Sequence, residues 1–390
     1  MVVALLVVAA PVASSPGVTK RVIRIGVHVP DTGAVPLPTD SSRRAAEIYW
    51  EWLQHKGLDI NGRRIEVIVR NDNTNPTQAV SVCKQMVRED NVFLLSGLLQ
   101  SPGNDQVQAC ARYAAEVGVP YVSLGVMKTG LRKLPNYFAI SMTHSKQALL
   151  LGDLFVDHLR ARRRVNGIVY INSQNYVPAH DAFVARMGAR KATVDYDRSV
   201  PKNAGSAEAQ LVIQEMQLAG VRNAFVHVTP TFFIQLLKYA NAQGYRPNWT
   251  GIGLTMTLGN HMIVSSCPDG SSIDGARFFS PIPAFNDADR FDPTFKRASD
   301  RLYGDGGDPT TWLGWSTSKA LRRMIELPGR DLTRKRFISS AERTGPIVTG
   351  ILPRFDFEAQ DHFGGKAIHL LRARCSDRRW HTVRSFVSDF

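Results

Sequence analysis

Apolar residues follow two alternating patterns along the first part of the chain. Short runs of consecutive apolar residues, typical of buried strands, alternate with stretches in which apolar residues recur every three or four positions, as on one face of a helix. This pattern predicts strands at 22–29, 65–69, 92–96 and 121–124, and helices over 45–53, 79–87 and 107–114. Strands that alternate with helices form a mostly parallel sheet that is covered on both faces.

A second unit of the same kind follows a further strand at 137–143. Its predicted helices span 144–161, 179–188, 206–219 and 231–243, and its predicted strands span 167–171, 193–196, 223–228 and 249–254. After Gly275 the pattern changes to an extended segment at 278–283, helices near 292–303, 309–326 and 331–343, and short strands and hairpins to the end. Helices so late in the chain indicate that it returns to the first unit.

The fold class predicted from this order is α/β, with two Rossmann-like lobes that each contain a doubly wound parallel sheet. At 390 residues, the chain is long enough for two domains of ordinary size. We expect residues 21–142 and 281–352 to form an N-terminal lobe, and residues 143–280 and 353–390 to form a C-terminal lobe. Several crossings between two lobes make a hinge, and a hinge permits a cleft that can close.

The first 15 residues, MVVALLVVAAPVASS, resemble the apolar part of a signal peptide. The apolar run of about ten residues is too short to span a bilayer, and it ends in small side chains near Ser14. No Lys or Arg precedes it, which departs from the usual signal pattern, and no Cys suited to lipid attachment occurs before Cys83. We therefore expect a protein that is exported to the periplasm or the outside of the cell, with no visible lipid anchor.

The net charge of +14 comes mostly from arginine, with local clusters at 160–164, 330–336 and 372–379. Such clusters can contact nucleic acid or anionic surfaces. No zinc-finger spacing, aromatic RNA-binding signature or separate helix-turn-helix segment accompanies them. We interpret the charge as a solvated basic surface and expect no nucleic-acid partner.

Four cysteines in an exported chain favour two disulfides, although sequence alone allows three pairings. Right-handed crossovers in a sheet ordered 2-1-3-4 place the helices that carry Cys83 and Cys110 side by side, at nearly the same height. We therefore predict a Cys83–Cys110 disulfide, with two separate buried thiols as the alternative. Cys267 and Cys375 then pair by elimination. The chain has no CxxC, HxxxH or HExxH spacing, so we expect no metal and no cofactor.

The most informative segment for function follows the strand at 92–96 and reads Gly97-Leu98-Leu99-Gln100-Ser101-Pro102-Gly103. A small hydroxyl and bare backbone lie there at the carboxyl end of a predicted strand. Open α/β sheets bind ligands at this end, because helix N-termini present unpaired N–H groups and a partial positive charge. The segment predicts a site for a small anionic or carboxylate-bearing molecule.

The chain resembles the type I periplasmic binding proteins in five segments, which follow one another in the order of that family. These segments are Asn75-Pro76-Thr77-Gln78-Ala79, residues 97–103, Ser123-Leu124-Gly125, Asn172-Ser173-Gln174-Asn175-Tyr176 and residues 350–356. The resemblance is to the leucine/isoleucine/valine-binding family of solute receptors for ABC importers, and it covers about residues 21–387. It implies a ligand held between two lobes.

Site residues are implied by this resemblance position by position. Ser101 matches the hydroxyl that binds the ligand carboxylate, with a helix N-cap as the structural alternative. Gly125 matches a residue whose carbonyl contacts the ligand ammonium, or is simply a turn glycine. Tyr176 matches the aromatic residue of the second lobe that closes over the ligand, or is a core or surface aromatic. Met127 stands where the family usually has Thr or Ser, so a polar contact is lost there.

Thr229 and Thr231 follow a strand of the second lobe and are expected to face the cleft, within one or two residues of register. The family's amino-acid binders also carry an acidic residue just after the strand equivalent to 249–254, and the segment here, Gly251 to Met256, has no carboxylate. A buried ammonium without a partner costs several kcal/mol. An amino-group-free aliphatic or aromatic acid therefore becomes as plausible a ligand as a branched-chain amino acid, and Met127, Leu254 and Met256 suit its apolar body.

Three function classes are compatible with a two-lobed α/β fold. The first is a monomeric binder that hands a small molecule to the permease of an ABC transporter, by closing when the ligand touches both lobes. The second is a sensor domain of the same fold, which would need a transmembrane helix or a DNA-binding segment that the sequence does not show. The third is an enzyme, but Ser101 lacks a Gly-x-Ser-x-Gly motif and no Ser/His/Asp order stands out. We expect the first class, with no catalytic residues.

Overall fold

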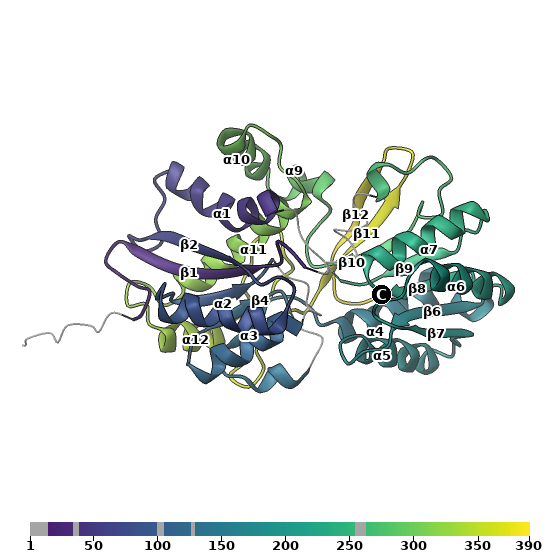
Figure 1. Cartoon of the computed structure of the whole chain (residues 1–390), viewed down its shortest axis with the longest axis horizontal. Coiled ribbons are helices and arrows are strands. Elements are labelled where there is room, and N and C mark those ends of the chain that lie inside the picture. Colours follow the sequence, from purple (N-terminus) through teal and green to yellow (C-terminus); the bar gives the residue numbers. More distant parts are fainter. Residues whose placement is uncertain (1–14, 34–38, 100–104, 126–128, 254–262) are drawn as a thin grey trace, which may run out of the picture.

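The computed structural model describes residues 15–33, 39–99, 105–125, 129–253 and 263–390. Figure 1 shows two lobes side by side, each built on a sheet with helices on both faces. The predicted α/β class with two doubly wound lobes is confirmed. Within the described ranges, no helix combines the length and the apolar character that a membrane crossing requires.

The first sheet has five parallel strands in the order β2-β1-β3-β4-β5. Their bounds are β1 Val22–Val29, β2 Arg64–Asn71, β3 Leu94–Gly97, β4 Tyr121–Ser123 and β5 Tyr137–Ala139. Every residue of β3 and β4 is buried, as expected for central strands of a sheet that helices cover on both faces.

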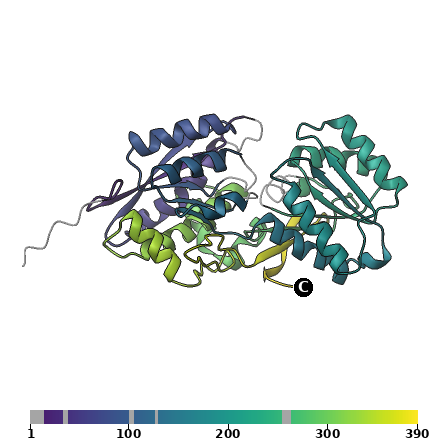
Figure 2. The ribbon, with the colours of Figure 1, turned by 90° about the horizontal axis from the view of Figure 1, so that it is seen from below.

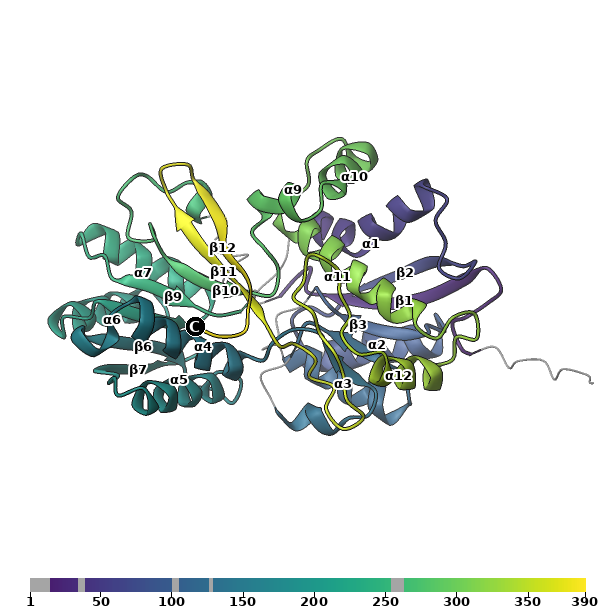
Figure 3. The ribbon, with the colours of Figure 1, turned by 180° about the vertical axis from the view of Figure 1, so that it is seen from behind.

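Helices from both halves of the chain cover this first sheet. Helices α2 (Pro76–Arg88) and α3 (Asp105–Glu116) lie on one face, and α1 (Thr39–His55), α11 (Pro309–Glu326) and α12 (Arg334–Arg343) lie on the other (Figures 1 and 3). Helix α10 (Thr294–Tyr303) packs beside α1, and the 3-10 turn η1 spans Thr129–Lys133. The late helices therefore pack against the first sheet and α1.

The α11 helix starts where its sequence dictates. Asp308 caps it by accepting hydrogen bonds from the backbone of Thr310 and Thr311, and Pro309 occupies the first turn, where no N–H is needed. The buried Trp312 and Trp315 each donate their indole N–H, to the Pro283 carbonyl and to Asp292 Oδ2, at 3.0 Å. The helix therefore anchors the apolar core that the first lobe builds against α1.

The second sheet has seven strands in the order β12-β11-β10-β9-β8-β6-β7. Their bounds are β6 Asn166–Ile171, β7 Tyr196–Val200, β8 Asn223–His227, β9 Asn248–Gly251, β10 Arg277–Ser280, β11 Ile368–Arg374 and β12 Arg379–Val387. Pairing is parallel from β7 to β10, and β11 and β12 add an antiparallel hairpin at one edge.

Within the described ranges, two long helices lie on each face of the second sheet. Helices α4 (His144–His158) and α5 (Val177–Ala189) pack on one face, and α6 (Ser206–Leu218) and α7 (Pro230–Ala242) pack on the other. The 3-10 turns η2 (Ala161–Arg163) and η3 (Phe285–Asp287) and the short α9 (Ala288–Phe291) complete the described elements. The arrangement places the loops after β6, β7, β8 and β9 at one edge of this sheet.

The chain passes between the lobes at residues 140–143, 281–288 and 365–367, and Figure 2 shows these segments from below. Phe363 forms a bridge with Ala139 of the first sheet, and Phe355 pairs with Ile347 and Gly365. Both phenylalanines lie in cores of the first lobe. We therefore propose that the third crossing follows Gly365, later than the expected boundary at residue 353.

The strand predicted at 193–196 is wrong in position along the chain, because the structure places β7 at Tyr196–Val200. This strand lies at the edge of the sheet, and its residues Asp197, Arg198 and Ser199 are polar. A partly exposed edge strand does not need a run of apolar residues. The hydrophobic pattern therefore predicted the strand a few residues too early, at 193–196. Ala192 and Val194 supplied that misleading signal, because they pack against the neighbouring helical core.

Two disulfides join the cysteines in the expected pairs. Cys83 of α2 is bonded to Cys110 of α3, with their Cα atoms 6.1 Å apart, and Cys267 is bonded to Cys375, with their Cα atoms 5.5 Å apart. Helices α2 and α3 are in contact along one face of the first sheet, as the right-handed crossovers required. The second bond ties the segment before β10 to the end of β11.

Candidate functional site

The two lobes contact each other beyond the carboxyl ends of their parallel strands. Gln108 Nε2, on α3 of the first lobe, donates to Asn175 Oδ1, which follows β6 in the second lobe, at 3.0 Å. Asn175 Nδ2 in turn donates to Asp105 Oδ1 at 3.0 Å. Gln108 and Asn175 are buried, so these hydrogen bonds are shielded from water. They identify the boundary between the lobes as a place where side chains of both sheets converge.

Asp105 is the charged group of this contact. Its second oxygen, Oδ2, lies 3.8 Å from Lys202 Nζ, which follows β7, and that lysine is largely exposed. An exposed pair of this kind adds little stability, because water screens it. The Asp105 carboxylate therefore lies at the solvent-exposed rim of the interface between the lobes rather than in its interior.

Tyr176 lies next to Asn175, at the start of α5. Its ring centroid is 4.6 Å from that of His227, the last residue of β8. Burial raises the pKa of the Tyr176 phenol to about 12, and the charge of Asp105 contributes in the same direction. The phenol is therefore a neutral hydrogen-bonding group at neutral pH.

A second histidine completes this group. His144 opens α4, and its ring centroid is 5.3 Å from that of His227. Burial lowers the pKa of His144 to about 4, and burial together with His144 lowers the pKa of His227 well below its usual range. Both imidazoles are therefore uncharged at neutral pH. We call His144, His227 and Tyr176 the histidine–tyrosine cluster.

The structure describes four of the six predicted ligand-binding residues, and they lie in different parts of the two lobes. Ser101 and Met127 lie outside the described residues. Gly125 is buried just after β4, and its carbonyl accepts a hydrogen bond from Ser123 Oγ at 3.4 Å. Tyr176 belongs to the histidine–tyrosine cluster. Within the described ranges, no hydrogen bond joins Gly125 to Tyr176.

The two threonines lie at the start of α7. Thr229 is its N-cap, because its Oγ1 accepts from the backbone N–H of Phe232 at 3.3 Å. Thr229 Oγ1 is also 3.1 Å from Thr231 Oγ1, and Thr231 is exposed. The cap is a structural role, so a ligand contact by either threonine remains a prediction.

Sequence reasoning missed His144, His227, Gln108 and Asp105 as site candidates. Asn175 carried a signal, because it precedes Tyr176 in the segment that resembles the family. The two histidines carried none, since one begins a helix and the other ends a strand, and only the packing of α4 against the sheet brings their rings together. No short sequence spacing encodes such a pair.

Another polar network lies inside the first lobe. His28 Nδ1 is 2.7 Å from Asp72 Oδ2, and His28 Nε2 bonds the Tyr121 hydroxyl. All three side chains are buried. A ring nitrogen of His28 also lies within 4.8 Å of the sulfurs of Cys83 and Cys110, but these form a disulfide and cannot act as thiolate ligands. We interpret this network as a satisfied polar core.

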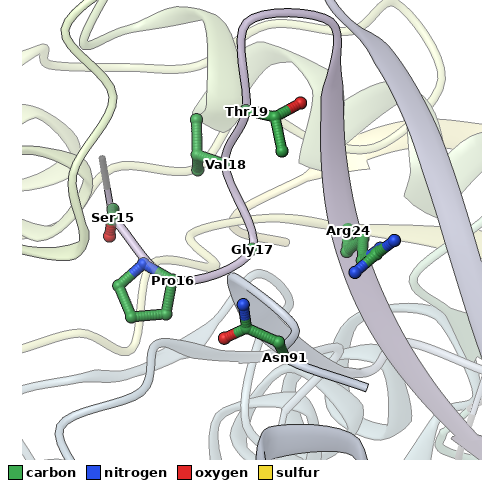
Figure 4. Close-up of a pocket in the computed structure, with 7 residues that line it drawn as sticks. All are labelled: Ser15, Pro16, Gly17, Val18, Thr19, Arg24 and Asn91. Atoms are coloured by element: carbon green, nitrogen blue, oxygen red, sulfur yellow. The ribbon is translucent and has the colours of Figure 1, made fainter. Parts of the chain in front are cut away.

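A pocket of about 350 Å³ opens at the amino ends of the strands in the first sheet, opposite the ends that face the second lobe (Figure 4). Its lining consists of Ser15, Pro16, Gly17, Val18, Thr19, Arg24 and Asn91. It lies near the amino ends of β1 and β3, away from the strand ends at which α/β sheets bind ligands. Arg24, its charged residue, already pairs with Glu66 at 3.3 Å. The pocket therefore does not compete with the interface between the lobes as a ligand site.

Two α/β lobes with three crossings, and polar side chains at their facing strand ends, define a two-lobed binding-protein fold. The chain belongs to the periplasmic binding protein family, whose profile matches residues 22–378. A comparison with curated protein sequences gives no significant match.

Solved structures with the same fold have low sequence identity to this chain. The branched-chain amino acid transporter substrate-binding protein of Streptococcus pneumoniae, in complex with isoleucine, is 15% identical, with a TM-score of 0.74 over 94% of this chain and 100% of that one. A solute-binding protein of Rhodopseudomonas palustris, in complex with 3,4-dihydroxybenzoic acid, is also 15% identical, with a TM-score of 0.74 over 94% and 96%. A fatty acid transporter substrate-binding protein of Thermomonospora curvata is 16% identical, with a TM-score of 0.77 over 96% and 95%.

Proposed function

We propose that this protein is an exported solute-binding protein of an ABC transporter, which captures a small carboxylate-bearing molecule between its lobes. The family match over residues 22–378 carries the proposal. The hydrogen bonds that join α3 to the segment before α5 support it, because they lie where a ligand would touch both lobes. The partner that receives the solute is the membrane permease of the transporter.

The mechanism is a shift between an open and a closed arrangement of the lobes. A ligand that touches both lobes binds the closed arrangement better and raises its population by that difference in affinity. The crossings at 140–143, 281–288 and 365–367 would serve as the hinge. No catalytic step belongs to this cycle, and the protein would act as a monomer.

The ligand contacts that we propose combine both lobes. Ser101 would bind the carboxylate, and Gly125 would contribute its backbone carbonyl. Tyr176, Thr229 and Thr231 would close from the second lobe, while Met127 would contact the apolar body of the solute. The proposed lobes are those of the sequence prediction, with the third crossing moved to residues 365–367.

The solute class stays open between a branched-chain amino acid and an acid without an amino group. Proteins of this fold have been solved with isoleucine and with 3,4-dihydroxybenzoic acid, so the fold accommodates both. The absence of a carboxylate in the sequence Gly251 to Met256 favours the second class.

Thermal unfolding with a panel of amino acids, aliphatic acids, aromatic acids and amides tests the proposal. A ligand at a hundred times its dissociation constant stabilises a protein by about 2.7 kcal/mol, which moves the unfolding midpoint measurably. Stabilisation by at least one carboxylate, confirmed by calorimetry with one site per chain, is the expected result. A panel in which no carboxylate binds would refute the proposed ligand class, and chemical turnover of a bound compound would indicate an enzyme instead.

A ligand-sensing receptor of the same fold is the second candidate. The fold supports it equally, because the same closure could signal rather than deliver a solute. Reconstitution with a permease distinguishes the two: ligand-dependent stimulation of its ATPase supports transport, whereas a partner that signals would support sensing.

A further inference from the structure

The histidine–tyrosine cluster contains buried nitrogen atoms that lack hydrogen bonds. Among the residues that the structure describes, neither ring nitrogen of His144 has a partner, and Nε2 of His227 has none either. Both side chains are buried. Buried polar atoms in folded proteins nearly always have a partner, so an unpartnered group of this kind calls for an explanation.

The cluster lies at the ligand-binding edge of the second sheet. His227 is the last residue of β8, and Tyr176 follows β6. Gly253, which follows β9, touches His144 so closely that a Cβ at Gly253 would lie 2.7 Å from ring atoms Cε1 and Nε2. Its φ of +89° also suits glycine. Three strand ends therefore converge on the two imidazole rings.

The chemistry of the rings limits what they can bind. A neutral imidazole offers one N–H donor and one nitrogen acceptor, so two such rings can bind a group that both donates and accepts. No carboxylate of the described residues contacts either ring, and the neighbouring Asp105 is already bonded by Asn175 and paired with Lys202. An ammonium placed here would lose its hydration without gaining a counter-charge.

We infer that His144 and His227 recognise an uncharged hydroxyl group of the solute, which donates to one ring and accepts from the other. The bound solute is then a hydroxylated carboxylic acid rather than an amino acid. This inference rests on the proposed function, because it treats the two rings as part of a solute site between the lobes. The protein of known structure with 3,4-dihydroxybenzoic acid shows that this fold accepts such a compound.

Calorimetry on the full chain tests the inference with matched compounds. The probes are 3,4-dihydroxybenzoate and benzoate as one pair, and 2-hydroxy-4-methylpentanoate and 4-methylpentanoate as the other, with leucine as the ammonium-bearing analogue. We expect the hydroxylated member of at least one pair to bind about tenfold more tightly than its partner. We expect His144→Phe and His227→Phe to remove this preference, because phenylalanine keeps the ring volume and loses both nitrogens.

His369→Phe is the control, since it replaces a buried histidine of β11 whose Nδ1 is also unpartnered but which lies outside the cluster. It should leave the preference unchanged. If a cluster variant does not fold, the wild-type chain labelled with ¹⁵N in its histidines gives the answer. The imidazole signals of His144 and His227 should shift with the hydroxylated acid and not with its partner.

The outcomes separate the inference from the proposed function. Equal affinities within both pairs, tighter binding of leucine, or unshifted imidazole signals would overturn the hydroxyl recognition while the binding function stands. If none of the carboxylates binds, the proposed function fails, and the inference fails with it.

Discussion

Gln108 Nε2 lies 3.0 Å from Asn175 Oδ1, and this hydrogen bond joins a helix of the first lobe to a loop of the second. Asn175 Nδ2 also donates to Asp105 Oδ1, so both the oxygen and the nitrogen of the Asn175 amide form hydrogen bonds with the first lobe. Both bonds join a residue of the first lobe to a residue of the second, so a separation of the lobes would break them. The pair therefore contributes to the closed arrangement and not to the fold of either lobe alone.

We predict that Asn175→Ala weakens solute binding by about five- to thirtyfold, because the loss of one or two hydrogen bonds of about 1 kcal/mol each destabilises the closed arrangement. Calorimetry with the solute that the panel identifies measures the affinity. X-ray scattering of the ligand-free protein should also show a larger radius of gyration for the variant.

Asn248→Ala is a matched control for this change. Asn248 Nδ2 donates to Asn223 Oδ1 at 2.8 Å, so the substitution also removes an amide–amide hydrogen bond, but within the second lobe. It should lower the free energy of unfolding and leave the affinity within about twofold. If Asn175→Ala and Asn248→Ala change the affinity equally, the bond to Gln108 has no role in closure.

Gly314 permits the close crossing of α1 and α11. A Cβ at Gly314 would overlap the backbone carbonyl of Ala45, which is not a flexible neighbour. We predict that Gly314→Ala lowers the free energy of unfolding by about 1–3 kcal/mol, because the two helices must separate within a close-packed core. Denaturant titration measures the change.

Gly188 offers the opposite test on another helix. It lies inside α5, and a Cβ there would have no atom within 4 Å. Gly188→Ala should therefore stabilise the protein by about 0.5–1 kcal/mol through helix propensity alone. Destabilisation of both variants by the same amount would mean that the contact with Ala45 does not decide the effect.

The disulfides are expected to stabilise the chain in proportion to the loops that they close. The bonded cysteines are separated by 27 residues for Cys83–Cys110 and by 108 residues for Cys267–Cys375. Chain-entropy arguments assign about 3.6 and 4.8 kcal/mol to such loops. We predict that the Cys267→Ala/Cys375→Ala double variant loses more stability than the Cys83→Ala/Cys110→Ala variant in denaturant titrations, and the reverse order would show that native packing outweighs loop closure.

The sequence predicted the order of elements well because each buried strand and helix carries its own hydrophobic period. The start of α11 at Pro309 could be read from Asp308 and Pro309 alone, since capping is local chemistry. The edge strand β7 could not, because it buries little. Cys83 and Cys110 were paired correctly since topology rules place α2 beside α3.

The site was less predictable than the fold. Tyr176 and Asn175 lie in a segment that resembles the family, so their part in the interface could be anticipated. The pair His144 and His227 depends on two elements that pack against each other from distant parts of the chain. No local sequence pattern encodes this pairing, because it depends on tertiary packing.

Stability should depend on pH through three buried histidines. Burial lowers the pKa of His144 and of His369 to about 4, and burial with the neighbouring His144 lowers that of His227 further. In the unfolded chain these rings have pKa values near 6.5. Between pH 6.5 and 4 the unfolded chain therefore binds protons that the folded chain does not, so acidification favours unfolding.

We predict that the free energy of unfolding is independent of these histidines above pH 6.5 and falls as the pH drops toward 4, by roughly 3 kcal/mol for each ring that stays neutral. Denaturant titrations at pH 7.5, 6.0, 5.0 and 4.5 measure the slope. His144→Phe and His369→Phe should each flatten the curve in this window, because phenylalanine has no proton to bind in either state. His381→Phe, which replaces a partly exposed histidine of β12, serves as the control for a ring near the surface. A slope that His144→Phe leaves unchanged would show that this ring is protonated in the folded chain and has found a partner for its charge.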